Sequence, residues 1–221
     1  MCPSTVRQSN IYHPKRYYAS VRKERIPVFE MLKENLNKSI VIFIDETGYN
    51  TNMRPKRSWQ PKGKRRVFPS SRLPNSSLIC AISKEFGVMG AQVVKSGAHS
   101  EDYTGFIYNL IKEWKLPNIE KPIIFFHDNL NVHHQAHKLI NKLGFENIRC
   151  EFNATYSPML NPIETFFSVH KRYVRKSMPV NAKELLISIF KGLDNISYEI
   201  INNIINHIFN LEESIRNLEI I

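Results

Sequence analysis

Short apolar runs alternate with polar stretches along the chain, and this pattern predicts five strands. The unbroken runs at 40–44 and 123–126 indicate strands that are covered on both faces, and a third short run follows at 148–152. Two further runs, at 77–82 and 88–94, flank the turn-like sequence SKEFG. This arrangement is typical of a β-hairpin.

Other segments repeat their apolar residues at helical spacing. Phe106, Leu110 and Trp114 recur in this way after Ser100 and are predicted to face the core, and Pro162 suits the first turn of a helix. Helices are expected at 26–37, from Ser100 to Trp114, between the strands at 123–126 and 148–152, from Pro162 onward, and in two segments over 181–218 that divide near 194–197.

The order of these elements defines the expected fold class. A strand and a hairpin come first, followed by strands that alternate with helices, which predicts an α/β fold with a mixed sheet flanked by helices. We expect a basic N-terminal arm or linker and a short helix over 1–38, a main domain over 39–180, and C-terminal helices over 181–221 that pack on it.

Three carboxylates are predicted to meet at one edge of this sheet. Asp45 and Asp128 directly follow buried strands, and Glu164 lies at the start of the helix that begins with Pro162. Mg²⁺ and Mn²⁺ prefer such an all-oxygen ligand set, and two ions can assist in-line attack on a phosphodiester. The alternative is a set of surface carboxylates near sheet ends. Glu46 should point to the opposite face, as a solvated group or a support rather than a ligand.

The charge of the chain favours a polyanionic partner. The formal net charge is +11, from 31 basic and 20 acidic residues, which points to nucleic acid but also fits a merely basic protein. Cations gather in two places that we predict to contact DNA: the loop after Asp45, and the face that Glu164 shares along its helix. The predicted contacts are the cations Arg54, Lys56, Arg57, Lys62, Lys64, Arg65 and Arg66 with the aromatic Trp59 among them in the loop, and Lys171, Arg172 and Arg175 on the helix.

The N-terminal residues are also basic, and we read them either as a DNA-facing arm or as a frayed terminus. The residues concerned are Lys15, Arg16, Arg22, Lys23 and Arg25.

Cysteine and histidine residues give little support for a zinc site. Cys2, Cys80 and Cys150 lack zinc-ligand spacing and indicate reduced thiols in an intracellular protein, and the chain has neither a secretory signal nor an apolar run that could span a membrane. His133 and His137 are four positions apart, but no third soft ligand stands nearby. The residues predicted to support the acidic site are Asn129, His133, His134 and Asn161.

Four motifs in this order resemble one family: FIDETGYN, SWQPKGKRR, FFHDNLNVHH and YSPMLNPIE. They resemble the catalytic domain of mariner-type DDE transposases and their bacterial insertion-sequence relatives, over residues 39–176. The resemblance implies an RNase H-like fold, a clamp loop at 48–66, and two Mg²⁺ or Mn²⁺ ions held by Asp45, Asp128 and Glu164. A terminal glutamate places the chain in the glutamate-ending branch, because mariner itself ends in aspartate.

The same resemblance implies a homodimer that acts on double-stranded DNA, with transposon ends and target as substrates. Members of the family carry paired helix-turn-helix modules before the catalytic domain, and the stretch before Asp45 is too short for them. We therefore expect a catalytic domain, a truncated copy or a domesticated derivative, located in the nucleus of a eukaryote, which we favour, or the nucleoid-associated cytoplasm of a bacterium. The predicted activity is DNA strand cleavage and strand transfer. The alternatives are a catalytically inactive DNA-binding protein and a nuclease of the same fold.

Overall fold

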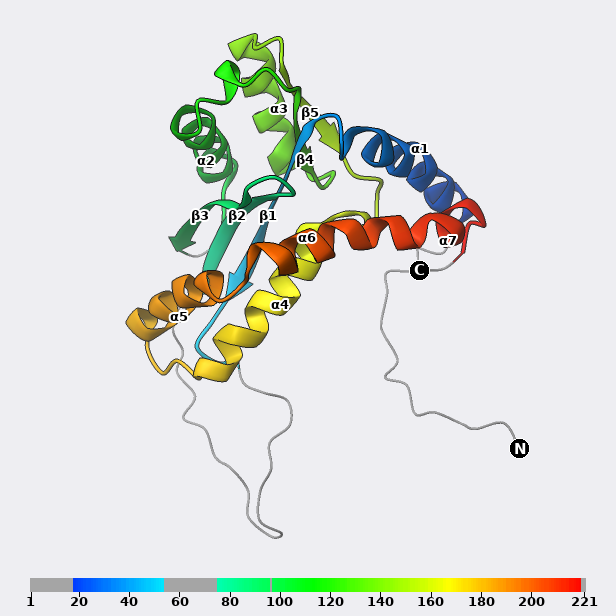
Figure 1. Ribbon diagram of the computed structural model, residues 1–221. Coiled ribbons are helices and arrows are strands. Elements are labelled where there is room, and N and C mark those ends of the chain that lie inside the picture. The colour runs from blue at the N-terminus through cyan, green and yellow to red at the C-terminus, as the bar shows by residue number, and fades with distance from the viewer. Residues whose placement is uncertain (1–17, 54–74, 96, 220–221) are drawn as a thin grey trace, which may run out of the picture.

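A single mixed sheet organises the protein. The computed structural model describes residues 18–53, 75–95 and 97–219, and its strands lie in the order β3-β2-β1-β4-β5 (Figure 1). Strands β1, β4 and β5 are parallel, whereas β2 pairs antiparallel with both β1 and β3. The bounds are β1 Ile40–Tyr49, β2 Ser76–Ser83, β3 Gly87–Lys95, β4 Ile123–His127 and β5 Ile148–Phe152. This confirms the predicted α/β class, the mixed sheet and the hairpin.

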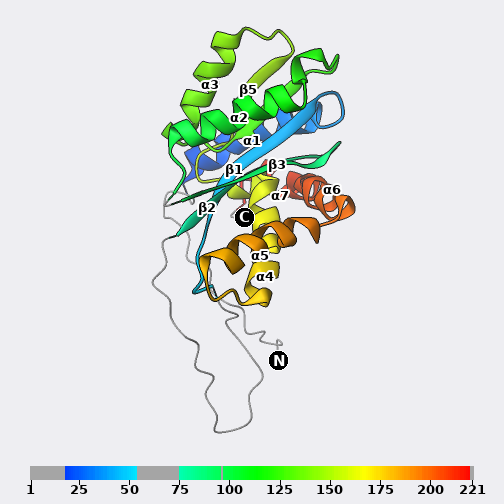
Figure 2. The ribbon, with the colours of Figure 1, turned by 90° about the vertical axis from the view of Figure 1, so that its left-hand side faces the viewer.

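Helices cover both faces of the sheet. The helices α2 and α3 lie on one face, and α1 and α4 to α7 lie on the other, so the sheet is the middle layer in Figures 1 and 2. Their bounds are α1 Ala19–Asn35, α2 Ser100–Glu113, α3 Asn131–Leu143, α4 Pro162–Ser177, α5 Ala182–Asp194, α6 Tyr198–Asn206 and α7 Glu212–Arg216. Short 3-10 turns occur at Leu116–Asn118, Pro158–Leu160 and His207–Leu211. None of the helices described is long and apolar enough to cross a membrane.

Alternation along β1 separates two hydrophobic cores. Val41 and Phe43 belong to the core shared with α1 and α4, and Ile42 and Ile44 belong to the core shared with α2 and α3. Successive side chains on a strand point to opposite faces, so the later residues of β1 continue to alternate between the α4 side and the α3 side. Asp45 therefore follows Phe43 on the α4 side, and Glu46 follows Ile44 on the α3 side.

Strand β1 is longer than the sequence pattern predicted. Its parallel pairing with β4 stops at Phe43, opposite Phe126, but its antiparallel pairing with β2 continues from Asp45 to Tyr49. The polar residues after Ile44 had suggested that the strand ends at Asp45, and this was wrong, because β2 satisfies the backbone where β4 has already ended. The predicted clamp loop at 48–66 thus begins inside a strand, and its residues from 54 onward lie outside those described.

The N-terminal helix is also longer than predicted. It begins at Ala19 rather than at residue 26, and it includes part of the segment that we had read as a basic arm. Arg25 is buried, and its Nε donates a 2.9 Å hydrogen bond to Ser157 Oγ. Arg22 donates a 2.6 Å hydrogen bond to the carbonyl oxygen of Leu218. A DNA-facing role for Arg25 was therefore wrong, because its side chain lies inside the protein.

Candidate active site

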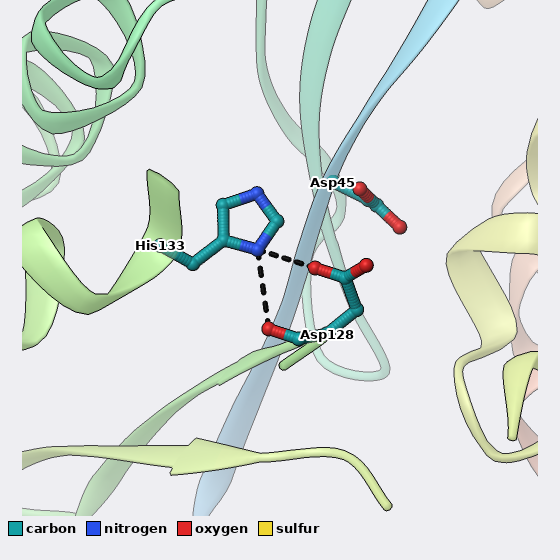
Figure 3. A group of neighbouring side chains, drawn as sticks. All are labelled: Asp45, Asp128 and His133. Atoms are coloured by element: carbon teal, nitrogen blue, oxygen red, sulfur yellow. Dashed lines mark hydrogen bonds and ion pairs between the residues drawn. The ribbon is translucent and has the colours of Figure 1, made fainter. Parts of the chain in front are cut away.

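Asp45 and Asp128 approach each other at the end of the parallel strands. Asp45 projects from β1 and is 5% exposed, and Asp128 directly follows the last residue of β4. One ligand atom from each of these aspartates and one from His133 lie within 4.8 Å of one another (Figure 3). The crossing from one strand to its parallel neighbour brings the two residues together, as the sequence predicted.

The Asp45 carboxylate is held on both of its oxygens. Oδ1 accepts a 2.8 Å hydrogen bond from the backbone N–H of Glu46, and Oδ2 lies 3.5 Å from the amide nitrogen of Asn161. Burial raises the pKa of Asp45 well above its ordinary value, and the negative charges of Asp128, Glu46 and Glu164 raise it further. A bound cation would relieve this repulsion between neighbouring carboxylates.

Glu164 reaches the site from the other direction, in the first turn of α4. It lines a cavity of about 330 Å³ together with Asp128, Asn129 and Asn161, and solvent reaches its side chain through this opening. Partial burial and the charge of Asp128 raise the pKa of Glu164, while the nearby Lys171 opposes the shift. Glu164 stands outside the close cluster of Asp45, Asp128 and His133.

His133 connects Asp128 to Glu46. Its Nδ1 forms an ion pair with the Asp128 carboxylate and lies 3.1 Å from the Asp128 carbonyl oxygen (Figure 3). Its Nε2 lies 3.0 Å from Glu46 Oε2. Burial alone would lower the pKa of His133, but hydrogen bonds and charges from Asp128 and Glu46 outweigh it and raise the pKa to about 10. The predicted direction of Glu46, away from Asp45 and in a supporting place, agrees with this contact.

Two aromatic side chains stand behind His133. The ring of Tyr103 stacks on the imidazole with centroids 4.2 Å apart, and the Tyr103 hydroxyl lies 2.8 Å from Nδ1 of His127 and 3.3 Å from the carbonyl oxygen of Ile44. His127 is fully buried, and burial lowers its pKa to about 3. The sequence did not single out Tyr103, although it lies one turn before Phe106 on the same face of α2.

Lys171 lies on the other side of β1. Its Nζ hydrogen-bonds to Thr47 Oγ1 and lies 5.6 Å from the centroid of the Tyr49 ring. Burial lowers the pKa of Lys171, and the charge of Glu164 partly offsets this effect. Arg172, next on the helix, is exposed. The DNA contacts proposed for this helix stay predictions, and the eight residues proposed in the loop at 54–66 lie outside the described residues.

The remaining predicted residues take different positions. Asn129 is exposed at the cavity, whereas the ring of His134 packs 4.6 Å from that of Phe152. His137 points its Nε2 at the side chain of Asn141, 3.0 Å away, so it does not pair with His133 around a common centre. The two cysteines that the structure describes are free thiols in strands, Cys80 buried and Cys150 half-buried.

The residues present suit a hard divalent cation. Four carboxylates, from Asp45, Glu46, Asp128 and Glu164, interact electrostatically here, and His133 is the buried cation beside them. Both nitrogens of His133 already face oxygen acceptors, which leaves carboxylate oxygens as the available ligands. Oxygen-rich sites of this kind bind Mg²⁺ or Mn²⁺ in preference to softer ions.

Comparisons with known proteins agree with this architecture. Residues 40–187 match a family model described as DDE superfamily endonuclease, and no curated protein matches the chain. The crystal structure of the Mos1 mariner paired-end complex with Mn superposes with a TM-score of 0.76 at 16% identity, covering 98% of this chain and 66% of that one. The Mos1 paired-end complex with the left transposon end gives 0.74 at 18% identity, over 96% and 66% of the two chains.

The isolated catalytic domain of Mos1 mariner transposase is matched almost end to end. It gives a TM-score of 0.66 at 14% identity, with 95% of this chain and 94% of that chain covered. At such identities the likeness shows the fold, which confirms the predicted RNase H-like class. The chain spans just under two thirds of the longer Mos1 chains.

Proposed function

Because the chain belongs to the DDE superfamily endonuclease family, we propose that it is a transposase catalytic domain that cleaves DNA strands and joins them to a target. The observation that carries this proposal is the convergence of Asp45 and Asp128, with Glu164 across the same cavity. One matched Mos1 complex contains the left transposon end, and another contains Mn. A DNA substrate and a divalent cation are therefore proposed for this chain as well.

In this proposal, Asp45, Asp128 and Glu164 hold two Mg²⁺ or Mn²⁺ ions. When bound, such ions activate an attacking water or 3′-hydroxyl and stabilise the leaving oxygen of an in-line displacement at phosphorus. The backbone N–H of Glu46 and the amide of Asn161 orient the Asp45 carboxylate. Lys171 lies two helical turns beyond Glu164, where its charge would meet the DNA backbone.

The substrate assignment extends this proposal. Hydrolysis at a transposon end would free a 3′-hydroxyl, and attack by that hydroxyl on target DNA at the same carboxylates would complete strand transfer. A homodimer would hold two DNA ends, and we propose an intracellular location where DNA is accessible. The cations of the loop at 54–66 and of α4 would contact the DNA backbone, and their positive charge supports this assignment.

The test is cleavage of supercoiled DNA by the purified chain in Mg²⁺ or Mn²⁺, compared with the Asp128→Asn variant. We expect nicking that a chelator abolishes, and a loss of at least about 10²–10³-fold in the variant, the scale on which removal of one stabilising group acts. DNA affinity should be largely retained. Asp194→Asn, an exposed change at the end of α5, is the matched control and should nick normally.

The outcomes separate the rival functions. Equal nicking by Asp128→Asn would contradict the proposed site. Salt-dependent DNA binding without turnover in either metal would instead support a non-catalytic DNA-binding protein. Nicking with no joining of a precut DNA end to a target would identify a nuclease of the same fold.

A further inference from the structure

We propose that Glu46 and His133 are positioning residues that fix the orientation of the Asp128 carboxylate, so that one oxygen is held and the other is presented beside Asp45. This inference rests on the proposed function, because it assigns to Asp128 the role of a metal ligand. It goes beyond that function by adding two residues that touch neither metal nor DNA. It also excludes His133, despite its closeness to both aspartates, from the ligand set.

The first observation is that His133 is fixed at both ends of its ring. It is fully buried, and its two nitrogens face oxygen atoms that belong to separate elements. Glu46 comes from β1, Asp128 follows β4, and His133 lies in the first turn of α3. A carbonyl oxygen and a carboxylate oxygen can only accept hydrogen bonds, so the ring must donate from both nitrogens to satisfy them.

The second observation is that the ring cannot rotate freely about its long axis. Tyr103 stacks against it, with planes inclined by 28°. Tyr103 is itself fully buried, and its hydroxyl is held by His127 and by the carbonyl oxygen of Ile44. Both the plane and the two ends of the imidazole are therefore fixed. The imidazole in turn fixes the orientation of the Asp128 carboxylate, which it contacts.

The consequence for Asp128 follows from its two oxygens. Oδ1 is engaged by His133, and Figure 3 shows the second oxygen turned away from the imidazole. Asp45 is oriented in a comparable manner by the Glu46 backbone and Asn161. Glu46 thus serves both aspartates, Asp45 through its backbone N–H and Asp128 through its side chain and His133. Partners of this type typically change metal affinity 10–100-fold when they are removed.

The experiment measures Mn²⁺ binding to the full chain by electron paramagnetic resonance, without DNA and without turnover. The variants are His133→Asn and Glu46→Gln, and Asp128→Asn is the reference for loss of a ligand. His137→Asn is the matched control, because it makes the same change one turn along α3, away from the acids. Circular dichroism verifies that each variant is folded.

We expect the Mn²⁺ dissociation constant to rise about 10–100-fold in His133→Asn and less in Glu46→Gln, whose amide oxygen can still accept from Nε2. His137→Asn should bind as the wild type does. Electron spin echo modulation of the wild type should show no directly coordinated nitrogen. If His133→Asn does not fold, Glu46→Ala, which removes the acceptor for Nε2 at a half-buried position, decides the question.

Two results would overturn the inference: unchanged Mn²⁺ affinity in the folded His133 and Glu46 variants, or a ¹⁴N coupling that marks His133 as a ligand. Failure of the proposed function is distinguishable, because Asp128→Asn would then also leave Mn²⁺ affinity unchanged. Weakened binding in Asp128→Asn with normal binding in the other two variants would retain the metal site and reject the positioning role.

Discussion

Two buried histidines lie on opposite sides of the outer half of β1, and their surroundings differ. On the α3 side, His133 lies between the carboxylates of Asp128 and Glu46, which raise its pKa to about 10. On the α4 side, His170 hydrogen-bonds to the Tyr49 hydroxyl through Nδ1 and to the Ile189 carbonyl oxygen, at 2.8 Å, through Nε2. Burial lowers the pKa of His170.

The different surroundings of the two histidines predict different roles: His133 contributes to the acidic site, and His170 contributes to stability. Because the carbonyl oxygen of Ile189 requires a donor, Nε2 of His170 carries a proton. Burial lowers the pKa of this ring and so favours its neutral form, in which Nδ1 accepts from the Tyr49 hydroxyl. It joins β1, α4 and α5 by packing and neutral hydrogen bonds. His133 joins charged groups at the acidic site. Changes on the α4 side should therefore reduce stability and spare metal binding, whereas changes on the α3 side should weaken metal binding.

The largest effect on stability is expected from Gly192→Ala in α5. A methyl group at this position would lie 2.7 Å from Nε2 of His170 and 3.0 Å from its Cδ2, so the ring would have to move. Overpacking of this kind costs about 1–3 kcal/mol, partly offset by the better helix propensity of alanine. We expect a melting temperature lower by several degrees, with unchanged Mn²⁺ affinity of the folded protein.

Gly105→Ala is the matched control for that substitution. Gly105 also lies inside a helix, α2, but nothing is found within 4 Å of its added carbon. The same change should therefore leave stability unaltered or raise it by about 0.5–1 kcal/mol. Equal melting temperatures for the two variants would contradict the close packing of His170 against Gly192.

The lowered pKa of His170 predicts how the stability of the protein depends on pH. The folded pKa of His170 is below its ordinary value of 6.5, so below pH 6.5 the unfolded chain binds more protons than the folded one. The contribution of His170 to the free energy of unfolding is thus complete above pH 6.5. It decreases as pH falls, by at most about 1.4 kcal/mol per pH unit.

Urea unfolding at several pH values between 7.5 and 5, without metal, measures this effect. We expect His170→Asn to show a flatter decline in the free energy of unfolding than the wild type. His127, whose pKa is lowered to about 3, acts in the same direction but is present in both proteins, so the difference isolates His170. Parallel curves would indicate that the folded protein binds a proton at His170 as readily as the unfolded chain.

The smallest effect is expected on DNA binding, from a substitution on the exposed surface of α4. Arg172 is solvent-exposed and follows Lys171, whose ammonium group is already bonded to Thr47. If α4 contacts the DNA backbone, Arg172→Gln should lower the slope of log affinity against log salt by about one, without sequence preference. Lys142→Gln, at the far end of α3, should leave the slope unchanged. Identical slopes for both variants would remove α4 from the DNA surface.

Much of the fold was predictable because strand and helix periods differ plainly in this chain. The runs 123–126 and 148–152 became β4 and β5, and Pro162 begins α4 as expected. The extension of β1 to Tyr49 was not predictable from local polarity, because its pairing partner lies about thirty residues away in β2. Likewise, nothing in the local sequence shows that Arg25 turns inward to Ser157, which is 132 residues distant.

The site was predictable in its acids and less so in their surroundings. The ends of two buried apolar runs placed Asp45 and Asp128, although β1 itself continues past Asp45, and strand alternation gave the side on which Glu46 lies. The meeting of Glu46 with His133 could not be deduced, because it depends on how α3 packs against β1. The pairing of Tyr49 with His170 was missed for the same reason, as it depends on the docking of α4.

The most direct test is a crystal structure of the protein with Mn²⁺, located by its anomalous scattering. We expect one or two ions bound to Asp45 and Asp128, about 3.5–4 Å apart when paired, with both aspartates oriented as they are now. Glu164, which lines the same cavity as Asp128 from the first turn of α4, should turn toward the ions. Ordered strands with no Mn²⁺ between Asp45 and Asp128, or an ion bound to His133, would contradict the proposed metal site.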